Sequence, residues 1–397
     1  MTALVIGGGF AGIAAAWALS RRGREVRLVW QGAGASSSYP GALDRVEWGA
    51  VPDARPLSAD AEAFLSALGC VAPPGSVPAR LATPAGVIRT ARCRDRALLD
   101  LEPWRGRRID VVDLGRPGWD AAALAHAWSE SGWARQTHTL FRALPVAPPD
   151  ADSARWLPDL ELAARADDPA WAERLAQVLA AAGNGESPLL MGPWLGLSSA
   201  SVERVRAGLR RPMGETLSEP GGAAGQRFES ARDACLERAG IAARTAFVSS
   251  VVRRSGRYEV LGRVEPDAPL TPLAEDVDLL ILAIGGVAGG GVRFLAGPGP
   301  EERSFSLSLS APVVLRLGGR EVSIQSGALG ADLQQLGMDA LMDVGLSVDE
   351  GMLARAPDLY AVGDVVADRP RCALEAIDSG LSAARAACRV RAPSLSP

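Results

Sequence analysis

The sequence of 397 residues contains no lysine, so all 42 of its basic side chains are arginines. It also has a single asparagine and only two histidines, His126 and His138. Without lysine, no side chain can form a Schiff base, anchor pyridoxal phosphate or complete the G-K-[ST] end of a Walker-type phosphate loop. Chemistry that depends on any of these lysine roles is therefore excluded.

Cysteines are few and scattered, and the basic residues do not outnumber the acidic ones. The five cysteines lie at least 16 residues apart, and the net charge is −4. With only two histidines, this spacing predicts neither a disulfide framework nor a zinc or iron–sulfur site, and the charge argues against nucleic-acid binding. Because no run of 18 apolar residues and no leader pattern is present, we expect a cytoplasmic protein without a transmembrane segment.

A dinucleotide-binding unit is the strongest pattern in the sequence. Apolar residues 3–6 read as a buried strand and lead directly into a G-x-G-x-x-G turn, after which residues 13–19 read as a helix and 26–30 as a second strand. In such a unit the glycines permit the tight turn, the approach of the pyrophosphate and close packing of helix on strand, and the helix N-terminus favours the negative charge. The residues predicted to bind a cofactor here are Gly7, Gly9, Phe10, Ala11 and Gly12.

One position departs from that pattern. The acidic residue that usually holds the adenosine ribose falls eighteen residues after Gly12, where this chain has Trp30 followed by Gln31. Either Gln31 or a backbone group holds the ribose, or the adenosine is held differently, with the indole against a ring. Alternatively, Trp30 only fills a hydrophobic edge.

Two later segments are similar to those of flavoproteins that have two dinucleotide-binding folds. Residues 278–286 resemble their V-V-L-A-T-G strand, and residues 357–364 resemble their N-L-Y-A-x-G-D segment. A strand that ends at glycine lets a ribityl chain approach, and an aspartate there accepts hydrogen bonds from the ribityl hydroxyl groups. A helix from Ala373 to Ala387 can stabilise reduced flavin through its N-terminus. The predicted cofactor is therefore FAD, with these further contacts: Val248 on the adenine side, Ala283, Ile284, Gly285, Gly363, Asp364, Cys372 and Ala373.

Further segments resemble one family, the B-type subunit of anaerobic glycerol-3-phosphate dehydrogenase. They are residues 32–44, 81–90, 215–227 and 283–292, which are similar to its S-S-G-x-x-D, L-P-T-x-x-G-x-x-R-P-T, E-x4-P-P-S-x-x-G-x-R-L and A-T-G-x-x-x-G-G-G-L segments. The resemblance implies a flavin-dependent dehydrogenase, often one member of a complex that passes electrons onward. It also implies that Ser36, Ser37 and Ser38 face the pyrophosphate and that Gly41 and Ala42 pass the flavin; a surface loop rich in serine is the alternative.

The predicted fold is α/β, with a discontinuous Rossmann-like FAD-binding domain and an inserted α+β substrate domain. We assign residues 1–75, 229–290 and 345–397 to the FAD-binding domain, and 76–228 and 291–344 to the substrate domain. Within them we expect helices at 228–239 and near Trp171, a hairpin around 255–256, a strand at 189–194 and a loop at 146–153.

Few side chains are available to accept a proton. Glu215 is the best carboxylate by position, His126 reads as part of an alanine-rich helix, and His138 reads as part of a strand. Arg89 and Arg227 match the family segments, and Arg371 adjoins one, so these arginines are candidates to bind an anionic substrate or a flavin phosphate, or are surface charges. The predicted catalytic set is Glu215, Arg227 and Arg89.

These patterns predict an FAD-dependent oxidoreductase. It would take a hydride from a small polar or anionic substrate and pass electrons to a partner protein or quinone. Two alternatives stay open, namely an electron-relay subunit that is inert outside its multi-subunit complex, and an amine or amino-acid oxidase, whose substrate needs less help from a base. A dehydrogenase that uses NAD alone would leave Gly363 and Asp364 without a role.

Overall fold

The computed structural model describes most of the chain, in nine segments. Of the predicted features, residues 151–153 of the loop at 146–153 and much of the segment 291–344 lie outside the described residues. The described ranges are 2–45, 55–150, 155–183, 185–295, 304–313, 315–317, 320–322, 344–349 and 353–389.

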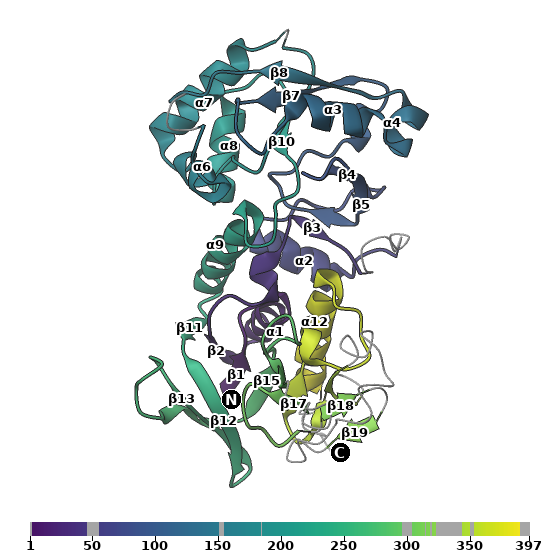
Figure 1. Ribbon diagram of the computed structural model, residues 1–397. Coiled ribbons are helices and arrows are strands. Elements are labelled where there is room, and N and C mark those ends of the chain that lie inside the picture. The colour runs from purple at the N-terminus through teal and green to yellow at the C-terminus, as the bar shows by residue number, and fades with distance from the viewer. Residues whose placement is uncertain are drawn as a thin grey trace.

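A six-stranded sheet forms the centre of one half of the molecule (Figure 1). The strands that cross its middle are short apolar runs buried on both faces, as expected of a parallel sheet covered by helices. All neighbours pair in parallel except the last two. In spatial order the strands are β11 (Ala242–Thr245), β2 (Glu25–Trp30), β1 (Thr2–Ile6), β15 (Leu279–Leu282), β22 (Leu359–Ala361) and β21 (Leu353–Ala356).

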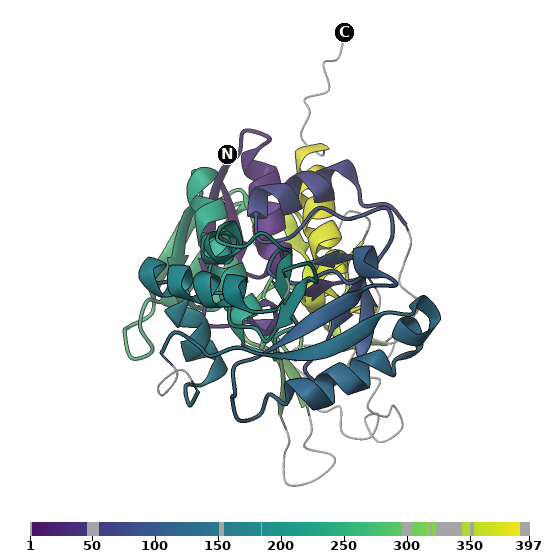
Figure 2. The same cartoon turned by 90° about the horizontal axis from the view of Figure 1, so that it is seen from above.

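Two helices from opposite ends of the chain pack together on this sheet. α1 (Phe10–Ser20) and α12 (Ala373–Arg389) run side by side in both views (Figures 1 and 2). They approach closely because a glycine stands at the contact, where a Cβ atom on Gly380 would lie 2.2 Å from the backbone oxygen of Ala11. Helices α2 (Ala59–Leu68) and α9 (Ala223–Arg238) complete this layer.

A second sheet has its own hydrophobic core in the other half of the molecule. Its strands are parallel, and tryptophans 119, 128, 171 and 194 are buried among its helices. The strand order is β10 (Met213–Glu215), β9 (Leu189–Met191), β7 (Arg108–Asp113) and β8 (Leu140–Pro145). The helices are α3 (Ala121–Ser129), α4 (Gly132–Thr137), α6 (Asp159–Arg165), α7 (Pro169–Ala181) and α8 (Ser199–Ala207), with a short 3-10 turn, η2, at Glu102–Trp104.

Smaller strand pairs connect and flank the two sheets. Two short pairs lie where the halves meet, one three-stranded sheet borders β2, and further strands follow residue 291. The connecting pairs are β3 (Ala42–Leu43) with β6 (Cys93–Arg94) and β4 (Ala79–Ala82) with β5 (Ile88–Ala91). The flanking strands are β12 (Phe247–Arg254), β13 (Arg257–Arg263), β14 (Thr271–Val277), β16 (Val292–Leu295), β17 (Ser304–Leu307), β18 (Leu315–Leu317), β19 (Arg320–Val322) and β20 (Gly345–Leu346).

Two expectations from the sequence need correction. The described part of 291–344 packs with the core of the six-stranded sheet, since Val292, Phe305 and Leu307 join that cluster and Ser310 bridges to Ser250. The predicted substrate domain required this segment to join the core of the second sheet, and the described part does not join it. His138 is not in a strand: it ends α4 with φ 55°, a left-handed conformation that stops the helix.

The other local predictions agree with the structure. The helix expected at 228–239 overlaps α9 up to its last residue, Arg238, and the helix expected at 373–387 lies within α12. The predicted hairpin turns at Ser255–Gly256, and β9 occupies part of the strand predicted at 189–194. Among the helices of the described residues, none has the length and apolar character needed to cross a bilayer. The α/β class with a parallel Rossmann-like sheet is confirmed.

We predict that Gly380→Ala destabilises the protein by about 1–3 kcal/mol, because the added methyl must push α12 away from α1 in a packed core. Urea unfolding followed by circular dichroism measures this change. Gly132→Ala in α4 is the control, since no heavy atom lies within 4 Å of the new methyl there and the exchange should be neutral or slightly stabilising. Equal stability of Gly380→Ala and the wild type would contradict the close approach.

Candidate functional site

A pocket of about 600 Å³ runs along the carboxyl edge of the six-stranded sheet. Four adjacent strands, β2, β1, β15 and β22, end at its wall, at Trp30, Ile6, Leu282 and Ala361. Three strand spacings separate the outer two, which gives the pocket a length of roughly 14 Å along the sheet. Ligands of open α/β sheets bind outside this edge, so the fold itself places a binding site here.

The glycine-rich turn lies at the middle of the pocket. Gly7 has φ 120°, and a Cβ atom there would lie 2.0 Å from the backbone oxygen of Ala283, so no other residue fits. The hydroxyl of Ser36 accepts a hydrogen bond from the Phe10 N–H at 3.1 Å, which ties the next loop to the start of α1. Because α1 begins at the pocket wall, where Phe10 and Ala11 line it, this region favours a negatively charged ligand group.

The serine loop is a 3-10 turn, η1 (Ala35–Ser38), held from behind by α9. Ser37 donates its hydroxyl to the Glu229 carboxylate, and a Cβ atom on Gly225 would lie 2.0 Å from the Ser37 backbone oxygen. The hydroxyl of Ser37 is therefore engaged with α9, and the loop is fixed against that helix by a glycine contact.

Asp364 marks the β22 end of the pocket. It follows Gly363, whose φ is 72° and whose N–H donates to the Ser379 hydroxyl at 2.8 Å. Burial raises the pKa of Asp364, and the guanidinium of Arg371 acts against that shift. Among the described residues, no group donates a hydrogen bond to the Asp364 carboxylate, which lines the pocket. A half-buried acceptor in this position suits a ligand that carries hydroxyl donors.

Arg371 also lines the pocket, but its guanidinium is directed to backbone oxygens. It donates to the carbonyls of Asp364, Val366 and Val344, the last two at 2.8 and 2.9 Å. These bonds fix the turn η5 (Gly363–Val365) beside the strand β20. Cys372 follows Arg371 on the pocket wall, just before α12 begins.

Asp44 and Arg89 form an ion pair on the wall between the two halves of the molecule. The Arg92 N–H donates to the Asp44 carboxylate at 2.8 Å, and the Asp44 backbone oxygen accepts from Leu374 at 3.2 Å. Burial raises the pKa of Asp44, while the Arg92 N–H and the Arg89 guanidinium lower it. This end of the pocket thus contains two arginines, two carboxylates and the N-terminus of α12.

At the β2 end the pocket wall is aromatic and cationic. The Arg232 guanidinium carbon lies 4.6 Å from the centre of the Trp30 ring, and both side chains line the pocket. Gly8 accommodates the same indole, since a Cβ atom there would lie 2.9 Å from it. Val248 lines this end as well, and Arg293 lines the pocket from β16.

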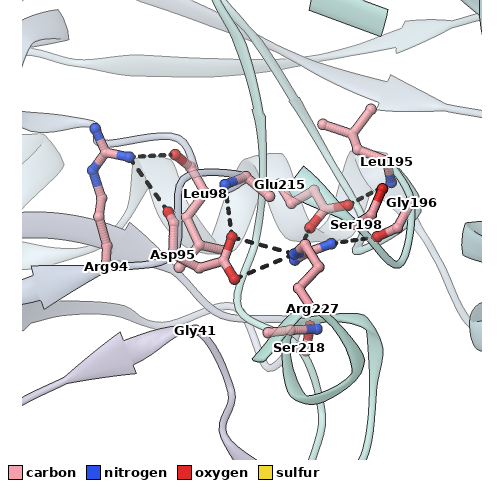
Figure 3. A network of polar contacts seen from close by, with 12 residues as sticks. Gly41, Arg94, Asp95, Leu98, Leu195, Gly196, Ser198, Glu215, Ser218 and Arg227 are labelled. Atoms are coloured by element: carbon pink, nitrogen blue, oxygen red, sulfur yellow. Dashed lines mark hydrogen bonds and ion pairs between the residues drawn. The ribbon is translucent and has the colours of Figure 1, made fainter. Parts of the chain in front are cut away.

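Glu215 and Arg227 lie outside the pocket lining, in a buried ion-pair network (Figure 3). The side chains of Arg227, Asp95 and Glu215 are all 0% exposed, with Arg227 Nη2 2.6 Å from Glu215 Oε2 and Nε 3.2 Å from Asp95. Burial alone would lower the pKa of Arg227, but the two carboxylates raise it above its ordinary value. Both carboxylates share the one guanidinium, away from the pocket. Glu215 and Arg227 therefore act as positioning residues in this structure, and their predicted catalytic role stays a prediction.

The network supports the pocket wall indirectly. Asp95 N–H donates to the Gly41 oxygen at 2.6 Å, and the Tyr39 hydroxyl donates to the same oxygen at 3.0 Å. Gly41 itself has φ 108° and packs against Leu98 instead of lining the pocket. The loop that leads to Ala42 is therefore held in place by Tyr39 and by Asp95, which is bonded to Arg227.

Most residues predicted to bind the cofactor do line this one pocket. Gly12 and Gly41 are the exceptions, and each supports the wall from behind. The candidate bases His126 and His138 lie on α3 and at the end of α4, and neither lines the pocket. Those that line it are Gly7, Gly9, Phe10, Ala11, Trp30, Gln31, Ser36, Ser37, Ser38, Ala42, Val248, Ala283, Ile284, Gly285, Gly363, Asp364, Cys372, Ala373 and, from the catalytic set, Arg89.

Arg232 and Arg293 line the pocket but were not predicted from the sequence. Helix periodicity could have indicated Arg232, because Gly225, Phe228 and Arg232 are spaced i, i+3, i+7 on the face of α9 that borders η1 and the pocket. Arg293 reaches the pocket through the pairing of β16 with β17, which no local pattern specifies.

One family model matches the first part of the chain. Residues 5–50 match the family described as NAD(P)-binding Rossmann-like domain, which agrees with the observed β1–α1–β2 unit. No curated protein sequence matches the chain.

Several solved structures align with nearly the whole chain, at low similarity. A GidA-related protein from Thermus thermophilus is 11% identical, with 98% of both chains covered and a TM-score of 0.33. Iminodiacetate oxidase from Chelativorans sp. BNC1 is 16% identical, with 100% of this chain and 97% of that chain covered and a TM-score of 0.30. Similarity of this extent supports no inference about the ligand or reaction of this chain.

We predict that Arg227→Met destabilises the protein by roughly 3–5 kcal/mol, because it leaves the carboxylates of Asp95 and Glu215 buried without their cation. Chemical denaturation gives the free energy of unfolding. The matched control is Arg135→Met, which breaks an exposed ion pair with Glu130 and should change stability by less than about 1 kcal/mol. Similar losses in both variants would argue against the network's structural role.

Proposed function

We propose that this protein is an FAD-dependent oxidoreductase that oxidises a small polar or anionic substrate. The observation that carries the proposal is the pocket itself, which joins the glycine-rich turn at β1 to Asp364 at the end of β22, whose carboxylate receives no hydrogen bond within the described part of the chain. A dinucleotide held only at the glycine-rich turn would not need an acceptor at Asp364. A ligand with a hydroxylated chain, in contrast, supplies hydrogen-bond donors to the Asp364 carboxylate.

The residues of the pocket fit FAD in charge and in shape. The N-terminus of α1 and the turn at Gly7 suit a pyrophosphate, and Asp364 suits the ribityl hydroxyls. The N-terminus of α12, which follows Cys372, suits the electron-rich edge of the ring system. When bound, FAD supplies the hydride-accepting chemistry, which no side chain of this chain offers.

Other residues would then bind and orient the substrate. Arg89 is one of two arginines at the β22 end of the pocket, and its contact with Asp44 fixes the guanidinium against the wall. Both lie beside the strands that connect to the second sheet, so we propose that residues 76–222 cover the substrate. Arg89 is suited to bind a carboxylate or phosphate of the substrate, and Asp44 is suited to accept a proton from the substrate.

The electron acceptor follows from the sequence resemblance alone. We propose a partner protein or a quinone, as the likeness to the B-type subunit of anaerobic glycerol-3-phosphate dehydrogenase implies. The described residues contain no group of three or more metal-binding side chains close enough to hold a metal ion, so we place no metal in the scheme.

The test of this function is the visible absorption spectrum of the gently purified protein, followed by anaerobic mixing with hydroxy acids, polyol phosphates and amines. We expect a flavin spectrum and its bleaching by one substrate class. A protein that neither retains flavin nor takes it up on reconstitution contradicts the proposal. A flavoprotein that no substrate bleaches would instead favour an electron-relay subunit.

We predict that Asp364→Ala lowers FAD affinity about tenfold or more, because the ligand's hydroxyl groups lose a charged acceptor. Fluorescence titration of the flavin-free protein with FAD measures the dissociation constant. Asp368→Ala is the matched control, since Asp368 is paired with Arg316 at the surface and does not line the pocket. Unchanged affinity in Asp364→Ala would remove the main support for FAD.

A further inference from the structure

The β2 end of the pocket lacks the group that normally selects an unphosphorylated ribose. A carboxylate at the end of the second strand accepts the ribose 2′-hydroxyl in such folds and repels a 2′-phosphate, whereas a nearby arginine accommodates that phosphate. Here β2 ends at Trp30 and is followed by Gln31. The described pocket-lining residues include two carboxylates, and both belong to the β22 end, on Asp44 and Asp364.

Arg232 stands close to the place that the missing carboxylate would occupy. Its guanidinium stacks on the indole of Trp30 at 4.6 Å, and its side chain is 8% exposed. Contact with the aromatic face uses none of the N–H groups of the guanidinium, which stay available as donors. The contact and the low exposure restrict the position of the guanidinium before any ligand binds.

Only part of the hydrogen-bonding capacity of Arg232 is used. Its Nε donates to Asp233 at 2.8 Å, and the Asp233 side chain is 59% exposed. Within the described residues, no acceptor is found for its two Nη groups. A buried guanidinium with unused donors on a pocket wall favours an anionic ligand group that can accept from both.

Arg293 is a further cation of the pocket. It lines the pocket from β16. The pocket wall at the β2 end thus combines Arg232 with the indole of Trp30 and the side chain of Val248. Such a lining suits an adenosine whose ribose carries an additional phosphate.

We propose that this end of the pocket is a subsite for 2′-phosphorylated adenine nucleotides, the class to which NADP(H) belongs, with Arg232 as the main phosphate ligand. The inference rests on the proposed role of the pocket in dinucleotide binding. FAD, which has no 2′-phosphate, would occupy the same cleft without using these donors, so the two nucleotide classes compete for it.

The experiment compares ADP-ribose with 2′-phospho-ADP-ribose as ligands of the full chain after removal of any bound flavin. Isothermal titration calorimetry gives both dissociation constants, and FAD is titrated into the same preparation. We expect the 2′-phosphorylated compound to bind about tenfold more tightly or better, from charge-assisted hydrogen bonds to Arg232. Equal or weaker binding of that compound overturns the inference.

Two variants on α9 should shift this preference in opposite directions. Arg232→Gln removes the cation and should abolish the preference, whereas Asp233→Asn removes the competing carboxylate and should increase it. Arg238→Gln, an exposed arginine on the same helix, should leave it unchanged. If Arg232→Gln does not fold, Asp233→Asn decides: an increased preference supports the subsite and an unchanged or reduced one overturns it.

The outcomes separate this inference from the proposed function. If FAD and ADP-ribose bind but the 2′-phosphate weakens binding, only the phosphate subsite is wrong. If none of the three compounds binds, both the subsite and the dinucleotide role of the pocket are wrong. If the phosphorylated compound binds preferentially and FAD does not bind, the subsite stands and the flavin assignment fails.

Discussion

The buried guanidinium of Arg227 is the interaction on which the arrangement of the pocket depends. Two carboxylates share one cation without solvent exposure, so loss of the cation would leave both carboxylates buried without compensation. Backbone N–H groups of Leu195 and Ala97 satisfy the remaining carboxylate oxygens. Arg227 is on α9, Glu215 ends β10 of the second sheet, and Asp95 follows β6. One cation therefore joins three separate segments of the chain.

That junction also determines what the pocket can contain. α9 presents Gly225 to the serine loop and Arg232 to the indole of Trp30, so its position sets both the middle and the β2 end of the cleft. Asp95 holds Gly41 by its N–H, and Gly41 leads into β3 and Asp44. A shift of α9 would consequently disturb the cleft over much of its length, although neither Arg227 nor Glu215 lines it. Arg227 and Glu215, which were chosen from the sequence as catalytic, thus lie behind the wall of the site and support it in this structure.

The sequence predicted the features that depend on local patterns. The unit from β1 to β2 was predictable because its glycines are required by contacts a few residues away, such as Gly12 against the Gly7 oxygen, where a Cβ atom would lie 1.9 Å away. The role of Arg227 was not predictable in the same way, because its partners lie 12 and 132 residues distant in the chain. The same limit applies to residues 292–307, whose packing partner is chosen by tertiary contacts. His138 shows that local patterns can also mislead, since a residue that ends a helix at positive φ can read as the start of a strand.

The absence of lysine shapes the electrostatics of the cleft. A lysine ammonium can reach an anion from many directions, whereas each arginine needs a planar support and acceptors in its own plane. Arg371 finds three backbone oxygens, Arg89 finds Asp44, and Arg232 finds the face of an indole. Of these three, the stacked one leaves the most donor capacity directed at the cleft. A chain restricted to arginine can thus separate structural cations from ligand-binding ones by what lies against the guanidinium plane. In this cleft Arg89 and Arg371, at the β22 end, are bonded to a carboxylate and to backbone oxygens, whereas Arg232, at the β2 end, lies over an indole.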